Sequence, residues 1–254
     1  MGVAGDVPEP TPTWPARLQL VRHGESAGNV ARDDAMRRRL AIIDISARDM
    51  DVGLSARGEQ QATAVGAWLG TEERRAEVVL TSPYVRAEQT ATLATATWNA
   101  TPVLDERLRE REFGILDRLT RRGIEERFPD EAKARGRLGK FYHRPSGGES
   151  WCDVAARVRS VLDTISRQYA GRDVVVFSHE VVIVMFCYVL QHLREDEVLA
   201  LGRERPLANC SVTTFRADPS DTEMELVEFG TTAAVEASPA ETTHEPAHVP
   251  PDSL

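Results

Sequence analysis

Cysteine, lysine and long apolar runs are all scarce in this sequence. Its three cysteines, Cys152, Cys187 and Cys210, form no C-x-x-C pair, so they provide neither a disulfide framework nor a zinc knuckle, and a reducing compartment fits the chain best. The most apolar stretch, residues 181–190, is about half as long as a transmembrane helix. Because residues 1–16 carry no signal-peptide pattern, the sequence predicts a cytoplasmic protein that makes no contact with membranes.

Basic residues are fewer than acidic ones, and almost all of them are arginine. The chain contains 31 Lys+Arg against 40 Asp+Glu, and its net charge of -9 has the same sign as a nucleic-acid backbone. Nucleic acid is therefore not an expected partner. Only Lys133 and Lys140 are lysines, which leaves 29 arginines, so an isolated arginine in a motif is weak evidence by itself.

Short apolar runs alternate with helical patterns over residues 17–230. Strands are predicted at residues 17–24, 78–83, 173–179, 211–217 and 223–229, and helices near residues 56–70, 83–96 and 150–169. This alternation predicts an α/β fold, a three-layer α/β/α sandwich around a mostly parallel central sheet. The charged, glycine-bearing stretch 109–147 interrupts the alternation and predicts a helical cap insertion.

The two ends of the chain lack periodicity. Residues 1–16 are rich in proline, and residues 231–254 are rich in Ala, Thr, Glu and Pro. Segments of this composition bury too little apolar surface to fold, so both ends are expected to be disordered. They would flank a single domain at residues 17–230.

Polar side chains follow three of the predicted strands. Arg22 and His23 end the first strand, Arg86 lies one helical turn after the second, and His179 ends the third. In open α/β sheets, ligands bind beyond the carboxyl ends of the strands, so these side chains converge if the strands are neighbours. Arginine binds phosphate bidentately and a neutral imidazole can act as a nucleophile, although each residue taken alone is more often structural than catalytic.

Five sequence blocks give these residues a family resemblance. They are RHGESAGN (22–29), GLSARGEQQA (53–62), TSPYVRAEQTA (81–91), RLREREFG (107–114) and VVVFSHE (174–180). Their content and order resemble the histidine phosphatase superfamily, also called the phosphoglycerate mutase-like family. The resemblance covers most of the predicted domain, and the joint order of the blocks carries it.

The resemblance implies a role for each matching residue. His23 would be the nucleophile that takes the phosphoryl group as a phosphohistidine, and Arg22, Arg86 and His179 would bind the phosphoryl oxygens. Glu110 would donate a proton to the leaving oxygen and then act as the base for water.

Two further residues of the first block, Ser26 and Asn29, would lie at the edge of the pocket. Two arginines and an imidazole can neutralise the phosphoryl oxygens by themselves, so neither a metal nor another cofactor is expected.

The substrate is less well defined by the sequence. Arg121 and Arg122 are candidates for binding a second anionic group, and the segment RPSGGESW (144–151), with Ser150, resembles a loop of the phosphatase branches. Glu180 stands where the family usually has glycine, and a carboxylate there could repel phosphate or restrict the substrate.

These observations predict a metal-independent phosphomonoester hydrolase that acts through a phosphohistidine on a small phosphorylated metabolite. A cofactor-dependent phosphoglycerate mutase and a non-catalytic phosphate-binding regulatory module stay open as alternatives. The expected partner is the small phosphorylated substrate, and a homodimer is left open.

Overall fold

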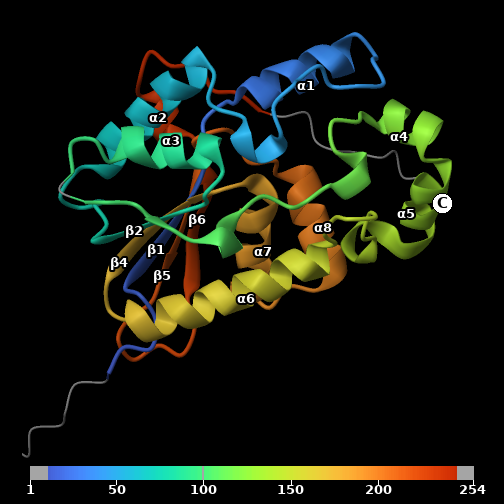
Figure 1. The fold of residues 1–254 in the computed structure, drawn as a ribbon. Helices are drawn as coiled ribbons and strands as arrows, with labels where there is room; N and C mark the ends of the chain where they lie inside the picture. Colours follow the sequence, from blue (N-terminus) through green and yellow to red (C-terminus); the bar gives the residue numbers. More distant parts are fainter. Residues whose placement is uncertain (1–10, 99, 245–254) are drawn as a thin grey trace, which may run out of the picture.

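The central sheet of the computed structural model, which describes residues 11–98 and 100–244, has six strands within these ranges (Figure 1). The strands are β1 (Arg17–Arg22), β2 (Val78–Thr81), β3 (Val103–Leu104), β4 (Asp173–Ser178), β5 (Val212–Arg216) and β6 (Glu225–Thr231). Their order is β3-β2-β4-β1-β5-β6, and the first four are parallel neighbours. Because β5 pairs antiparallel with both β1 and β6, antiparallel pairing is confined to one edge, and the predicted mostly parallel sheet is confirmed.

Helices cover both faces of the sheet and create two separate apolar cores. Along β4, Val174 and Val176 belong to one core, whereas Val175 and Phe177 belong to the other, because alternate side chains of a strand point to opposite faces. The first core includes residues of α6 (Trp151–Gln168) and α7 (Glu180–Leu190), and the second includes residues of α2 (Ala56–Leu69) and α3 (Val85–Ala94). The two pairs lie on opposite sides of the sheet in Figure 1, which confirms the predicted sandwich.

The stretch between β3 and α6 forms the predicted helical insertion. It contains two 3₁₀ helices, η2 (Glu106–Leu108) and η3 (Gly114–Leu116), followed by α4 (Arg121–Arg127) and α5 (Pro129–Tyr142). Helix α5 contacts α6 and also α8 (Glu195–Glu204). The insertion and α1 (Ala27–Arg37) project beyond the sheet on the same side of Figure 1. None of the helices in the described ranges is long and apolar enough to cross a membrane.

The predicted domain, residues 17–230, is too short at both ends. Trp14 Nε1 donates to the carbonyl of Thr222 (2.8 Å), which ties the segment before β1 to the body of the fold. After β6, the chain forms the short helix α9 (Ala233–Glu236), and both Ala234 and Val235 are buried in the second core. The prediction of disorder from residue 231 is therefore wrong up to residue 244, and residues 1–10 and 245–254 lie outside the described part of the chain.

Two glycines allow the loop after β1 to pack tightly against α2. An added Cβ on Gly24 would lie 2.6 Å from the carbonyl oxygen of Gly58, and one on Gly58 would overlap the carbonyl group of Glu25. One turn further along α2, Gln61 Oε1 accepts a hydrogen bond from the Glu25 N–H (2.9 Å). This contact fixes the direction that the chain takes after β1.

We expect Gly58→Ala to lower the free energy of unfolding by about 1–3 kcal/mol, because the new methyl group meets backbone atoms that cannot rotate away. Gly136→Ala is the matched control, since Gly136 also lies in a helix and an added Cβ there meets nothing within 4 Å. The control should gain roughly 0.5–1 kcal/mol from helix propensity. Urea denaturation measures both variants, and equal stabilities would contradict the close approach.

Candidate active site

The pairing of β1 with β4 brings two histidines together at the end of the sheet. Arg22 and Ser178 are partners in the register, and the His23 N–H donates to the Ser178 carbonyl (2.9 Å). As a result, the rings of His23 and His179 lie 5.1 Å apart. Both residues are buried, and the strand ends converge as the sequence predicts.

The backbone carbonyl of Gly24 sets the tautomer of His23. Its oxygen lies 2.7 Å from His23 Nδ1, and because a carbonyl oxygen can only accept, Nδ1 carries the proton. The lone pair of the neutral ring then resides on Nε2, which accepts a hydrogen bond from Arg86 Nε (3.3 Å). A nitrogen able to act as a nucleophile thus stands beside a fixed positive charge.

His179 is held from the end of β2. Its Nε2 lies 2.8 Å from Ser82 Oγ, whereas its Nδ1 is buried without a hydrogen-bond partner in the described part of the chain and lies 3.9 Å from Glu110 Oε2. Burial, followed by the charges of Arg86 and His23, lowers the pKa of His179 well below its ordinary value. The ring is therefore neutral near pH 7 and presents a buried nitrogen to the site.

Glu110 has the protonation behaviour of a proton carrier. Burial raises the pKa of its carboxyl from an ordinary 4.5 to about 7, and this effect exceeds the opposing influence of the Arg111 N–H, which donates to Oε1 (2.8 Å), and of the Arg86 charge. A carboxyl group with this pKa can donate a proton and recover it at neutral pH.

Asp49, in η1 (Asp49–Asp51), is a site residue that sequence reasoning misses. Its Oδ1 lies 3.1 Å from Arg86 Nη1 and its Oδ2 accepts from Nη2 (3.2 Å), while its carbonyl accepts a further bond from Nη1 (2.6 Å). A carboxylate in this position competes with phosphate for the same donors. Asp49 belongs to none of the five sequence blocks, so the sequence carries no signal for it.

Motif residues outside the cavity hold the loop that follows β1. Ser55 Oγ caps α2 by accepting from the Gly58 N–H (3.1 Å), and it donates to Glu25 Oε1 (2.6 Å). From α3, Thr90 Oγ1 accepts from the Gly24 N–H (3.1 Å). The blocks at residues 53–62 and 81–91 therefore fix the backbone on which His23 stands.

Asn209 supports the same loop from a segment that the sequence analysis does not single out. Its Nδ2 donates to the carbonyl of His23 (3.1 Å), and its Oδ1 accepts from Thr243 Oγ1 (3.0 Å). Thr243 Oγ1 accepts in turn from Gln61 Nε2 (2.9 Å). The segment after α9, expected to be disordered, thus braces the backbone of His23.

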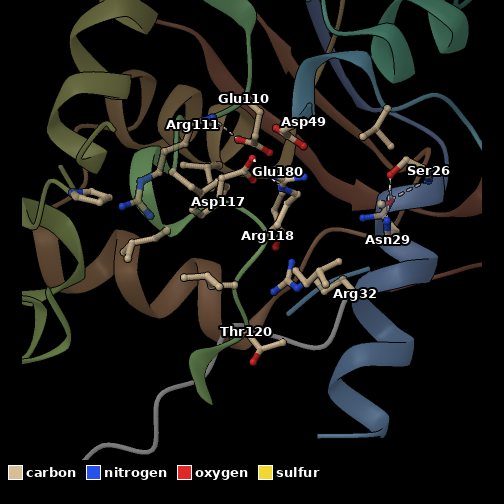
Figure 2. A pocket seen from close by; sticks show the side chains of 18 of the residues that line it. Ser26, Asn29, Arg32, Asp49, Glu110, Arg111, Asp117, Arg118, Thr120 and Glu180 are labelled. Atoms are coloured by element: carbon tan, nitrogen blue, oxygen red, sulfur yellow. Dashed lines mark hydrogen bonds and ion pairs between the residues drawn. The ribbon is translucent and has the colours of Figure 1, made fainter. Parts of the chain in front are cut away.

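Of the five residues predicted to bind substrate, Ser26 and Asn29 line the cavity of the site (Figure 2). They also cap α1, since Ser26 Oγ accepts from the Asn29 N–H (3.1 Å) and Asn29 Oδ1 accepts from the Ser26 N–H (2.9 Å). These bonds fix both side chains at the N-terminus of the helix.

The other three, Arg121, Arg122 and Ser150, are not among the cavity-lining residues in the described ranges, and these predictions need correction. Each arginine pairs with the glutamate four residues later, on an exposed face of α4. Ser150 is buried and caps α6, since its Oγ accepts from the Asp153 N–H (3.2 Å) and also donates to Asp153 Oδ2 (2.7 Å). Local helix contacts thus occupy all three side chains.

The cavity has a volume of about 210 Å³ and a surplus of positive charge. Seven basic and four acidic side chains of the described residues line it, which leaves three positive charges over in a chain of net charge -9. In Figure 2, Arg32, Arg111 and Arg118 come to it from different parts of the fold. Residues 11–98 and 100–244 contain no group of three or more His, Cys, Asp or Glu side chains that could hold a metal ion.

Glu180, at the start of α7, contributes one of the acidic side chains. Its Oε2 lies 3.6 Å from Arg22 Nη1, an atom that also donates to the carbonyl of Leu207. The carboxylate partly neutralises Arg22 and adds a hydrogen-bond acceptor to the cavity wall.

Comparison with known proteins identifies the family. The sequence profile of the histidine phosphatase superfamily (branch 1) matches residues 18–229. The chain belongs to this superfamily. A 2,3-bisphosphoglycerate-dependent phosphoglycerate mutase of Methylobacterium radiotolerans is 34% identical over 186 residues, which are 71% of this chain and 82% of the mutase.

Two further proteins show the range of relatives of this chain. A bifunctional protein of Mycobacterium tuberculosis is 32% identical over 204 residues, which are 80% of this chain but 51% of that protein, so the chain spans about half its length. The solved structure of a mycobacterial glucosyl-3-phosphoglycerate phosphatase with inorganic phosphate is 26% identical, with a TM-score of 0.68 over 87% of this chain and 99% of that one. The prediction of a phosphatase- or mutase-like enzyme is confirmed.

The pKa of Glu110 gives the enzyme a defined pH dependence. The group donates a proton only when protonated, so we expect kcat/KM to fall as pH rises through about 7. His179, with its lowered pKa, stays neutral throughout this range. Glu110→Gln should lower the rate by about 10²–10⁴-fold, and the kcat/KM of this variant should not show the decrease with rising pH. Because the substrate titrates identically with both enzymes, the ratio of their pH profiles isolates Glu110, and a ratio independent of pH would contradict its role.

Removing the charge of Asp49 should strengthen phosphate binding. In Asp49→Asn, the guanidinium of Arg86 no longer faces a competing carboxylate, and we expect the inhibition constant of inorganic phosphate to fall by about threefold to tenfold. Asp51→Asn is the control, because Asp51 lies in the same 3₁₀ helix but pairs with Arg48 on the surface. Weaker phosphate inhibition in Asp49→Asn would mean instead that Asp49 orients Arg86.

Proposed function

We propose that this chain is a metal-independent phosphomonoester hydrolase that forms a phosphohistidine at His23 and acts on a small phosphorylated metabolite. The observation that carries the proposal is the fixed tautomer of His23. With Nδ1 bonded to the Gly24 carbonyl, the lone pair on Nε2 is available beside the Arg86 guanidinium. A nucleophile and a cation able to bind phosphate thus lie next to each other.

In the first step, His23 Nε2 attacks phosphorus and the bond from phosphorus to the leaving oxygen breaks. Arg22, Arg86 and the buried Nδ1 of His179 lie where they can hold the phosphoryl oxygens, with Nδ1 bearing the proton when Ser82 Oγ donates to Nε2. The proton of Glu110 passes to the leaving oxygen, which departs as an alcohol.

In the second step, the Glu110 carboxylate takes a proton from water, and the resulting oxygen nucleophile attacks phosphorus. The bond from phosphorus to Nε2 breaks, which returns the lone pair to His23 and releases inorganic phosphate. Glu110 ends the cycle protonated, as it began. One carboxyl group with a pKa of about 7 serves both steps.

A mutase is the second candidate, and the 34% identity to a phosphoglycerate mutase supports it. Mutase and hydrolase share the first step and differ in what attacks the phosphohistidine, either a hydroxyl of the substrate or water. Isomerisation of 3-phosphoglycerate by enzyme primed with 2,3-bisphosphoglycerate would assign the chain to the mutases. The presence of His23, both arginines, Glu110 and His179 speaks against a module without turnover.

The deciding experiment is phosphate release from a panel of phosphomonoesters and sugar phosphates in EDTA, comparing wild type with His23→Ala. We expect release by the wild type and a loss of at least about 10³-fold in the variant, because no other described residue offers a nucleophile at this position. A brief exposure to labelled substrate should leave an acid-labile phosphoprotein in the wild type and none in the variant.

His192→Asn is the matched control, since His192 is an exposed histidine that pairs with Glu223 and is not among the residues that line the cavity in the described ranges. Its activity should equal that of the wild type. Phosphate release that survives in His23→Ala, or a wild type with neither release nor phosphoprotein on any compound, would refute the proposed hydrolase.

A further inference from the structure

Three polar side chains, those of Gln61, Thr243 and Asn209, connect the two ends of the loop that follows β1; we call them the polar network. The Glu25 N–H donates to Gln61 Oε1 (2.9 Å), and Gln61 Nε2 donates to Thr243 Oγ1 (2.9 Å). Thr243 Oγ1 donates to Asn209 Oδ1 (3.0 Å), and Asn209 Nδ2 donates to the carbonyl of His23 (3.1 Å). The network therefore starts at Glu25 and returns to His23, so that it closes around the loop.

The four hydrogen bonds of the polar network all run in the same direction. Each side chain accepts from the group before it and donates to the next, so turning either amide around would place donor against donor. Hydrogen bonds arranged in series also polarise and strengthen one another. Gln61 is 0% exposed and Asn209 is 1% exposed, so water does not replace a bond that either side chain loses.

The polar network holds the two peptide groups on either side of Gly24. The Gly24 carbonyl, whose oxygen lies 2.7 Å from His23 Nδ1, belongs to the same planar peptide group as the Glu25 N–H. Gln61 therefore fixes the plane from which this carbonyl reaches the imidazole. The His23 carbonyl belongs to the preceding peptide group, which Asn209 holds. Because a glycine joins the two planes and rotates freely, these contacts keep its carbonyl on Nδ1.

The backbone beside Asn209 is strained in support of the same loop. Cys210 has a φ of 55°, in the left-handed region that residues with a Cβ seldom adopt. In this conformation its N–H donates to the carbonyls of Arg22 (3.1 Å) and His23 (3.3 Å). The Asn209 N–H donates to the Thr243 carbonyl (3.0 Å), which ties this turn to the C-terminal segment. Strain of this kind persists only where the surrounding contacts hold it, and it clusters at functional sites.

We infer that Gln61, Thr243 and Asn209 are positioning residues for the nucleophile. By holding the Gly24 carbonyl against His23 Nδ1, they keep the proton on Nδ1 and the lone pair on Nε2, the nitrogen that attacks phosphorus. The inference rests on the proposed function for the role of Nε2. It gives the segment after α9 a part in the reaction, although none of the three side chains is among the described residues that line the cavity.

Thr243→Val tests the middle of the polar network, because it removes the hydroxyl and keeps the shape of the side chain. On the phosphomonoester that the wild type hydrolyses fastest, we expect kcat to fall by about tenfold to a hundredfold, since displacing a reacting group by about 1 Å is enough for such a loss. KM should change by less than about twofold, because the groups that bind the phosphoryl oxygens are unaltered. Thr243→Ser, which restores the hydroxyl, should recover the wild-type kcat.

Ser238→Ala is the matched control from the same segment, because the Ser238 hydroxyl donates locally to the carbonyl of Val235. Its kcat should equal that of the wild type. Gln61→Leu, which breaks two bonds of the network, should lower kcat at least as much as Thr243→Val. The double variant of Gln61 and Thr243 should be no slower than Gln61→Leu alone, because both residues act through one network. Losses that multiply in the double variant would contradict the inference.

The tautomer of His23 tests the inference without turnover. At a pH where the imidazole is neutral, the NMR shifts of isotopically labelled ring nitrogens distinguish the protonated from the unprotonated atom, and comparison with His23→Ala assigns the signals. We expect the proton on Nδ1 in the wild type, in Thr243→Ser and in Ser238→Ala, and a mixture of both tautomers in Thr243→Val. This arm separates the two proposals, because a tautomer that depends on Thr243 supports the positioning role even if no compound is hydrolysed. A wild-type tautomer in Thr243→Val, or a loss of kcat that Thr243→Ser does not rescue, would overturn it.

Discussion

The parallel pairing of β1, β4 and β2 is the constraint on which the site depends. His23 follows β1, His179 follows β4 and Ser82 follows β2, so the imidazoles and the hydroxyl meet only when the three carboxyl ends are level. A slip of one residue would exchange the two faces of a strand. Along β4 such a slip would move Val174 and Phe177 into the wrong cores. The alternation that separates the two cores therefore also aligns the groups that we propose to be catalytic.

The sequence predicts those features that leave a periodic or ordered pattern. Strands buried on both faces appear as continuous apolar runs, and His23, Arg86 and His179 are located because each follows a recognisable strand. Glu110 is located only by the family resemblance of its block. Asp49 and Asn209 leave no such trace, since their roles arise from contacts with residues 37 and 186 positions away in the chain. Long-range side-chain contacts of this kind depend on the fold and not on local spacing.

Of two errors in the sequence predictions, one had a local signal that could have prevented it and the other did not. The run from Arg121 to Glu126 places two glutamates four residues after two arginines, a spacing that forms ion pairs along an exposed helix face. In the C-terminal segment, the Ala-Ala-Val-Glu stretch has helical propensity, but it is only one turn long. Its stability comes from packing on α2 and the second core, which composition alone does not reveal.

Burial shifts the pKa values of Glu110 and His179 in opposite directions. The same loss of water that raises the pKa of Glu110 to about 7 lowers that of His179, because each group is driven toward its neutral form. A neutral carboxyl group can give up a proton, and a neutral imidazole beside His23 does not add a second positive charge to the nucleophile. Arginine resists this effect because its intrinsic pKa is so high. The site can therefore keep its cations for phosphate while its acid and its imidazole remain uncharged, which is the combination that phosphoryl transfer to a histidine requires.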